Sequence, residues 1–186
     1  GHAAIAMREA GFRGRILLVG DEPYRPYERP PLSKEMLTAA VEPPPLWFHA
    51  EARYAERAID IRPSSPAVAI EPASQRVVLR DGTRLPYDRL LLATGGRARP
   101  LPVPGGQHAL LLRTLDDARA LRARLRPGIR VACIGAGVIG LEIAAAATAR
   151  GCLVEVIEAG PQAMGRSVTP EFAALIAGLH RAAGVR

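Results

Sequence analysis

The feature that most constrains the fold is a strand–helix–strand pattern in the second half of the chain. Residues 129–134 predict a buried strand, 135–140 a glycine-rich turn, 138–150 a helix and 153–157 a second strand. A unit of about thirty residues in this order is the building block of a doubly wound parallel sheet. A second, incomplete copy lies nearer the start, so we predict an α/β protein.

The turn at 135–140 has three glycines in the spacing GxGxxG. The first permits a tight turn, the second lets a pyrophosphate approach the backbone, and the third lets helix and strand pack closely. Glu158 follows about twenty residues later, where a carboxylate accepts ribose hydroxyls and repels a 2′-phosphate. The alternative is a packing turn. The combined pattern favours NADH, and we assign cofactor binding to Gly135, Gly137, Val138, Ile139, Gly140 and Glu158.

The first part of the chain contains the incomplete copy. Residues 3–10 predict a helix ended by Gly11, and 15–19 predict a buried strand that leads to the sequence Gly-Asp-Glu at 20–22. The proline-rich stretch 23–31 comes next. A short helix follows it, and Ser33 is the expected cap.

Short strands are predicted after residue 59. Residues 68–71 and 76–80 flank a turn, and an Asp-Gly turn at 81–82 leads to a third strand at Leu85. We also expect an apolar strand at 89–93. A linker rich in proline and glycine follows at 100–106. Thr114 is expected to cap a helix over 114–126, with Asp117 as its partner in a capping box.

Composition excludes several other classes of protein. The net charge is +7, but the arginines of the chain are scattered, and no basic run carries aromatic residues for base stacking. We therefore expect no nucleic acid partner. The longest apolar run, 139–148, is too short for a membrane span and contains Glu142. No signal peptide is evident, so we expect a cytoplasmic location. Cys133 and Cys152 lack redox or zinc spacing, and the four histidines are isolated, so we assign no metal.

The segment Pro-Tyr-Glu-Arg-Pro-Pro-Leu-Ser-Lys at 26–34 resembles a motif of the ferredoxin reductase branch of the FAD/NAD(P)-dependent pyridine nucleotide oxidoreductases. This branch includes the reductases of dioxygenase and P450 systems and is similar to the apoptosis-inducing factors. The resemblance extends over the chain through 20–22, 93–95, 112–114 and 137–142. It implies two Rossmann-like domains, an FAD-binding domain at 1–105 and an NAD-binding domain at 106–186.

The resemblance also implies roles for individual residues. Lys34 and Glu142 would meet beside the flavin, and they are the expected catalytic pair. Lys34 is the only lysine in a chain that otherwise uses arginine, and a fixed ammonium stabilises negative charge that develops on reduced flavin. Glu142 is alternatively a partner of the helix dipole alone. The expected flavin nucleotide contacts are Asp21 or Glu22, Arg29, Lys34, Val68, Thr94, Gly95 and Arg113. Independently of the resemblance, Arg166 is expected to contact NAD, with a solvated surface arginine as the alternative.

The resemblance implies hydride transfer from NADH to FAD, then single-electron transfer to an iron–sulfur ferredoxin of an oxygenase system. The alternatives are a reductase of the rubredoxin, monodehydroascorbate or nitrite reductase type, and an FAD protein like the apoptosis-inducing factors. The chain departs from the family in lacking the first glycine fingerprint and the later segments. We therefore expect a fragment in which both domains are incomplete.

Overall fold

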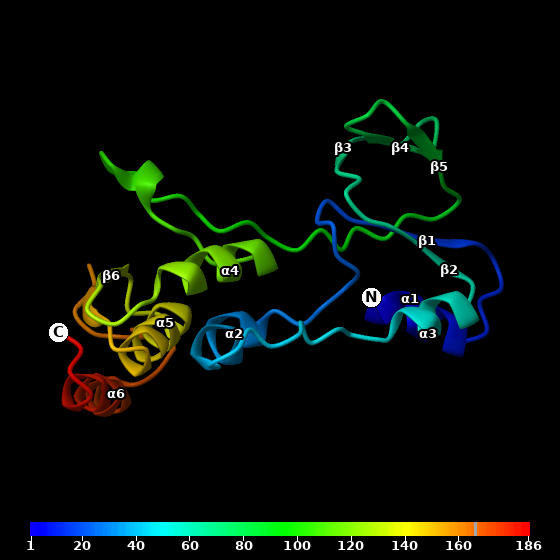
Figure 1. The fold of residues 1–186 in the computed structure, drawn as a ribbon. Helices are drawn as coiled ribbons and strands as arrows, with labels where there is room; N and C mark the ends of the chain where they lie inside the picture. Colours follow the sequence, from blue (N-terminus) through cyan, green and yellow to red (C-terminus); the bar gives the residue numbers. More distant parts are fainter. Residues whose placement is uncertain (166) are drawn as a thin grey trace. The chain divides into compact units, whose positions relative to one another are not determined.

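The computed structural model describes residues 1–165 and 167–186, which form two compact units. Unit 1 comprises Gly1–Glu28 and Leu46–Gly96, and unit 2 comprises Arg29–Pro45 and Arg97–Arg186 (Figure 1). The sequence predicts a single domain boundary after residue 105, whereas each of the two units contains two separate segments of the chain. The segment 29–45 clusters with unit 2 because its helices pack on the helices of that unit.

Unit 1 contains a parallel strand pair with helices. Helix α1 (His2–Glu9) is followed by β1 (Ile16–Val19), and α3 (Glu51–Glu56) is followed by β2 (Ile59–Arg62). Strands β1 and β2 pair in parallel, with Ile16 opposite Ile59. The predictions for 3–10 and 15–19 are confirmed. The buried core of the unit consists of Ala4, Ile5, Ile16, Tyr54 and Ile59.

A three-stranded antiparallel sheet completes unit 1. Strands β3 (Ala67–Glu71), β4 (Arg76–Leu79) and β5 (Arg84–Pro86) are neighbours in chain order, joined by tight turns. Gly82 has φ +85°, a conformation that strongly favours glycine in the second turn. The predicted strands and turns of this sheet are confirmed.

The strand predicted at 89–93 is wrong. The described residues place no strand there, and the sheets of unit 1 are built from other segments. Leu91 and Leu92 are 62% and 63% exposed. A strand exists only when a neighbour supplies a hydrogen-bonding ladder, so an apolar run with high strand propensity does not form one alone.

Unit 2 contains the strand–helix–strand pattern. Its elements are β6 (Arg130–Ile134), α5 (Val138–Ala149) and β7 (Leu153–Ile157), and the two strands pair in parallel with Val131 opposite Val154. Helix α4 (Leu115–Arg124) precedes them and α6 (Pro170–Ala182) follows them. The prediction of this α/β unit is confirmed.

The chain end extends this sheet. The backbone N–H of Arg186 donates to the Val154 carbonyl at 3.0 Å, and Val156 N–H donates to Arg186 at 2.7 Å. Leu153 donates instead to Ile129, on the side of β6. Because successive residues of a strand bond to opposite neighbours, Arg186 lies on the far side of β7. The order, with the next segment beside the second strand, is that of a doubly wound fold.

Helix α4 begins with a capping box. The Thr114 hydroxyl accepts from the Asp117 N–H, and the Asp117 carboxylate accepts from the Thr114 N–H. Helix α6 begins similarly, since Thr169 accepts from Phe172 N–H and Pro170 occupies the first turn. The capping prediction for Thr114 is confirmed.

The capping prediction for Ser33 is wrong. Ser33 ends a 3₁₀ turn, Pro30–Ser33, and Lys34 occupies the cap position of α2 (Glu35–Thr38) without a side-chain capping bond. The Ser33 hydroxyl is used in a tertiary contact with Glu142 instead.

Helix α2 joins the core of unit 2, in which Leu37 packs with residues of α4, α5 and both strands. The buried members of this core are Leu37, Leu121, Leu125, Cys133, Ala144, Ala146, Ala147, Cys152, Val154 and Val185. None of the helices formed by 1–165 and 167–186 combines the length and apolarity needed to cross a membrane.

Candidate functional site

The glycine turn between β6 and α5 has two positions that the fold itself restricts to glycine. Gly135 has φ +101°, a region that side chains disfavour. A Cβ added to Gly140 would lie 2.1 Å from the Gly135 carbonyl oxygen, which belongs to rigid backbone. Gly140 therefore allows the helix to approach the strand.

Gly137 is different, because its φ of −77° suits any residue. Among the described atoms, none lies within 4 Å of a Cβ added there. Neither the backbone conformation nor the packing of the described atoms therefore requires glycine at this position. A ligand that approaches the backbone closely would require it.

Helix α5 begins at this turn with an accessible N-terminus. Gly137 is its cap and offers no side-chain acceptor to the first turn. Val138 and Ile139 in that turn are half exposed. The first amides of a helix lack intrahelical acceptors, and with the helix dipole they bind phosphate.

Glu158 lies next to this turn, at the end of β7. One carboxylate oxygen, Oε2, accepts from the Ala136 N–H at 2.7 Å, and Oε1 accepts from the Gly160 N–H at 2.8 Å. The side chain is exposed but oriented by these two amides. The arrangement fits a ribose of NAD next to the pyrophosphate turn. Arg166, also expected near this cofactor, lies outside the described residues.

Lys34 and Glu142 form an ion pair in unit 2. The Lys34 ammonium lies 3.1 Å from Glu142 Oε1 and 3.4 Å from the Pro30 carbonyl oxygen. The side chain of Lys34 is 47% exposed and that of Glu142 is 26% exposed. Glu142 follows Gly140 by two residues in α5. The Lys34 ammonium is therefore held near the N-terminal end of α5, where the glycine turn lies.

Ser33 is a site residue that the sequence analysis missed. It is only 6% exposed, and its hydroxyl donates to Glu142 Oε2 at 2.5 Å. Glu142 therefore receives one donor on each carboxylate oxygen. The available signal is a small polar residue directly before Lys34, a pattern that is equally typical of a local helix cap.

Two arginines anchor the segment that carries Ser33 and Lys34. Arg122 donates to the Met36 and Ala39 carbonyl oxygens, at 2.7 Å each. Arg150 donates to the Leu37 carbonyl oxygen at 3.1 Å. These carbonyls lack intrahelical partners because α2 ends there, so the guanidinium groups satisfy them. Arg29 is held in the same unit by a 2.6 Å bond to the Arg113 carbonyl oxygen.

The residues expected at FAD lie mostly in unit 1. Asp21 is exposed and lies two residues beyond the end of β1, whereas Glu158 directly follows β7. Glu22 accepts a hydrogen bond from the Tyr27 hydroxyl. Gly20 and Glu22 accept, through their carbonyls, from the amides of Ser65 and Ser64. Asp21 is therefore joined to the connection between β2 and β3.

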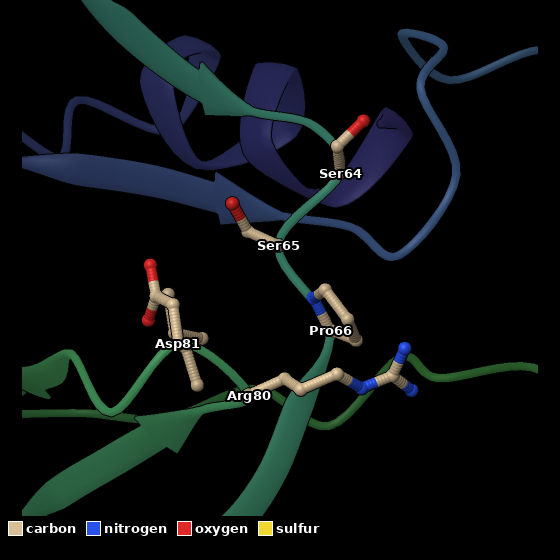
Figure 2. A pocket seen from close by; sticks show the side chains of 6 residues that line it. Ser64, Ser65, Pro66, Arg80 and Asp81 are labelled. Atoms are coloured by element: carbon tan, nitrogen blue, oxygen red, sulfur yellow. The ribbon is translucent and has the colours of Figure 1, made fainter.

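A cavity of about 290 Å³ lies at this connection. Figure 2 shows Ser64, Ser65 and Pro66 on one side of it and Arg80 and Asp81 on the other. The lining combines the polar residues Ser64, Ser65, Arg80 and Asp81 with Pro66 and Leu79, and it lies next to the bonds that hold the Asp21 segment.

Other expected FAD contacts are exposed in unit 1. Val68 lies in β3, directly after this connection, and is exposed. Thr94 and Gly95 are exposed, and Gly95 has φ +67°.

The cysteines are buried and free. Cys152 Sγ donates to the Arg126 carbonyl oxygen, and burial raises the pKa of the Cys133 thiol. A thiol with a raised pKa is a poor nucleophile. The described part of the chain contains no cluster of three or more potential metal ligands.

Comparison with known proteins gives the relatives of this chain. It is 41% identical over 186 residues to the ferredoxin–NAD(+) reductase component of the 3-phenylpropionate/cinnamic acid dioxygenase of Photorhabdus laumondii, covering 99% of this chain and 47% of the relative. It is 39% identical to a rubredoxin–NAD(+) reductase of Pseudomonas putida, covering 99% and 48%.

The fold is similar to that of a solved ferredoxin reductase. The ferredoxin reductase for the CYP199A2 system of Rhodopseudomonas palustris has a TM-score of 0.93 and 42% identity, over 98% of this chain and 46% of that one. The chain spans about half the length of the curated relatives it matches. The resemblance inferred from 26–34 to ferredoxin reductases, and with it the two-domain Rossmann-like fold class, is confirmed.

The family model described as "Pyridine nucleotide-disulphide oxidoreductase" matches residues 1–186. Together with the glycine turn and the parallel sheet, this match establishes that the chain belongs to the pyridine nucleotide-disulphide oxidoreductase family.

Proposed function

We propose that this chain is the nucleotide-binding part of an NADH-dependent flavoprotein reductase. The enzyme transfers a hydride from NADH to FAD and then single electrons to an iron–sulfur ferredoxin of an oxygenase system. The similarity to reductases of dioxygenase and P450 systems supports this assignment. We further propose that the enzyme works in the cytoplasm, and the two free cysteines suit a reducing compartment.

One observation carries the proposal: α5 joins the glycine turn to the Lys34–Glu142 pair. Gly140 ends the turn, and Glu142, two residues later, holds the only lysine of the chain 3.1 Å away. A nucleotide whose pyrophosphate lies on the amides of α5 is therefore bound close to a fixed ammonium.

The NAD site consists of the turn and the end of β7. The amides at Val138 and Ile139 bind the pyrophosphate, and Gly137 leaves it room. Glu158 accepts the ribose hydroxyls, and its charge selects NADH over NADPH. The two amides that already orient this carboxylate reduce the entropy lost on binding.

The FAD contacts are proposed by analogy with the relatives. Asp21 is the better candidate for the adenosine ribose, because it is exposed whereas Glu22 is half-buried. The remaining proposed contacts are Arg29, Lys34, Val68, Thr94, Gly95 and Arg113, and Arg166 is proposed at NAD. When bound, FAD supplies the conversion between two-electron and one-electron transfer.

The protein contributes electrostatics at Lys34. Glu142 pairs with the ammonium and orients it, while the Lys34 side chain remains 47% exposed. A cation fixed in advance stabilises negative charge that develops nearby without the cost of reorientation. We therefore propose Lys34 and Glu142 as the catalytic pair.

The test uses the full-length protein purified with FAD. We expect NADH to bleach the flavin absorbance and to support reduction of a [2Fe–2S] ferredoxin. Lys34→Ala should slow flavin reduction by about ten- to a hundredfold. Removal of one preorganised electrostatic contact costs at least about a hundredfold, and we expect somewhat less here because Lys34 is half exposed. A colourless protein that does not bind NADH in calorimetry would refute the proposal.

The second candidate is a rubredoxin reductase. The 39% identity to a rubredoxin–NAD(+) reductase is close to the 41% identity to the dioxygenase component. Parallel assays with a [2Fe–2S] ferredoxin and a rubredoxin distinguish the two. A much higher kcat/KM for rubredoxin would favour this candidate.

A further inference from the structure

We propose that Ser33 is a positioning residue for the Lys34–Glu142 pair. Its buried hydroxyl holds the Glu142 carboxylate in the orientation that fixes the Lys34 ammonium. The catalytic meaning of this inference rests on the proposed function, but the contact itself can be tested without nucleotide.

The Ser33 hydroxyl has one proton and two acceptors within reach. The Pro30 carbonyl oxygen lies at 3.5 Å, and Glu142 Oε2 lies at 2.5 Å. A carboxylate is the stronger acceptor, and the shorter distance agrees with donation to it. Glu142 Oε2 is thus occupied, and Oε1 accepts from Lys34 at 3.1 Å.

Without this bond the ion pair would be weakly restrained. Lys34 is about half exposed, and exposed pairs contribute little because long side chains lose entropy when they are held in place. Glu142 is the less exposed partner. Its other carboxylate oxygen, Oε2, is held by Ser33, which is only 6% exposed. The rigid part of the site is therefore Ser33–Glu142, and Lys34 is fixed through it.

The backbone at Ser33 is anchored independently of its hydroxyl. Leu32 beside it is buried, and Arg122 and Arg150 bond to the end of the following helix. Removal of the hydroxyl is therefore expected to leave the segment in place. The loss should be limited to the orientation of Glu142.

The first measurement is the reactivity of the Lys34 amine. The full-length protein is treated with an acylating reagent, and modification of Lys34 is followed by peptide mapping. Ser33→Ala should raise the rate at Lys34 about two- to fivefold, which corresponds to weakening an exposed ion pair. Thr148→Ala is the matched control, because it removes a hydroxyl that bonds within α5 and should not change the rate.

The second measurement is stopped-flow reduction of the flavin by NADH. Ser33→Ala should lower the limiting rate and leave the Kd for NADH unchanged. Ser33→Thr and Ser33→Val form a second pair with the same shape, of which only Thr keeps the hydroxyl. Thr should behave like the natural protein, and Val like Ala. This pair keeps the test decisive if the alanine variant is unstable.

The outcomes separate the two proposals. Equal Lys34 reactivity in the Thr and Val variants would overturn the role of Ser33, whatever the enzyme does. Altered reactivity in a protein that NADH does not reduce would support the role of Ser33 and contradict the proposed function. A fall in unfolding temperature without a change in either measurement would show a purely structural hydroxyl and overturn the inference.

Discussion

Replacement of Gly140 by alanine tests the geometry of the glycine turn. The added Cβ would lie 2.1 Å from the Gly135 carbonyl oxygen, well inside van der Waals contact, and backbone must move to relieve it. Overpacking of this kind costs about 3 kcal/mol at the upper end of its range. Alanine recovers about 1 kcal/mol through its higher helix propensity. The expected net loss of stability is about 2 kcal/mol.

Gly137→Ala is the matched comparison. Among the described atoms, none is near the added Cβ, and φ is −77°, so stability should fall only by the cap preference for glycine over alanine, about 0.5–1 kcal/mol. The methyl group would instead occupy the space proposed for the pyrophosphate. We expect NADH affinity to fall at least about tenfold, a difference of about 1.4 kcal/mol.

Thermal unfolding and calorimetric NADH titration of both variants measure these effects. A loss of about 2 kcal/mol should lower Tm by about 4–8 °C for a chain of 186 residues. Gly140→Ala should therefore melt clearly earlier, whereas Gly137→Ala should lose at most about half as much stability but bind NADH poorly. The reasoning is refuted if Gly140→Ala melts like the natural protein, or if Gly137→Ala binds NADH normally.

Three further predictions concern other contacts. Glu158→Ala should lower NADH affinity about tenfold and reduce the preference over NADPH, as measured by calorimetry with both nucleotides. Arg122→Met should destabilise unit 2 by about 1–3 kcal/mol in urea unfolding because α2 loses its carbonyl partners, whereas exposed Arg124→Met should not. Hydrogen bonds from the Thr83 backbone and side chain lower the pKa of Asp81. The stabilisation they provide is present above about pH 4 and is lost as pH falls through the lowered folded-state pKa. Asp81→Asn should therefore flatten the stability profile below about pH 4, and an unchanged profile would contradict this assignment.

The unit around β6, α5 and β7 was predictable because its signals are local. Strand periodicity, the glycine spacing and Glu158 all lie within about thirty residues, and the glycines restrict the backbone directly. The cap at Thr114 was predictable for the same reason, since both of its partners lie within one helical turn.

Ser33, the segment 29–45 and the strand expected at 89–93 were not predictable in this way. Ser33 and Glu142 are 109 residues apart, and Arg122 lies 86 residues beyond Met36. Ser33 is typical of a local helix cap, but its hydroxyl donates to the Glu142 carboxylate, which is the stronger acceptor. At 89–93 the propensity was present, but the part of the chain that the structure describes offers no neighbouring strand.

The sequence by itself determined the family, the nucleotide turn and the identity of the two charged residues, because backbone restrictions and helix caps depend on neighbours along the chain. The resemblance already implied that Lys34 and Glu142 meet, and only the tertiary structure decided that Ser33 joins them in one contact set. The contact between these residues depends on the packing of α2 against α4 and α5. It also depends on Arg122 and Arg150, which donate hydrogen bonds to the free carbonyl oxygens of α2. Such long-range partners are chosen by burial and hydrogen-bond geometry, which no local window of sequence contains.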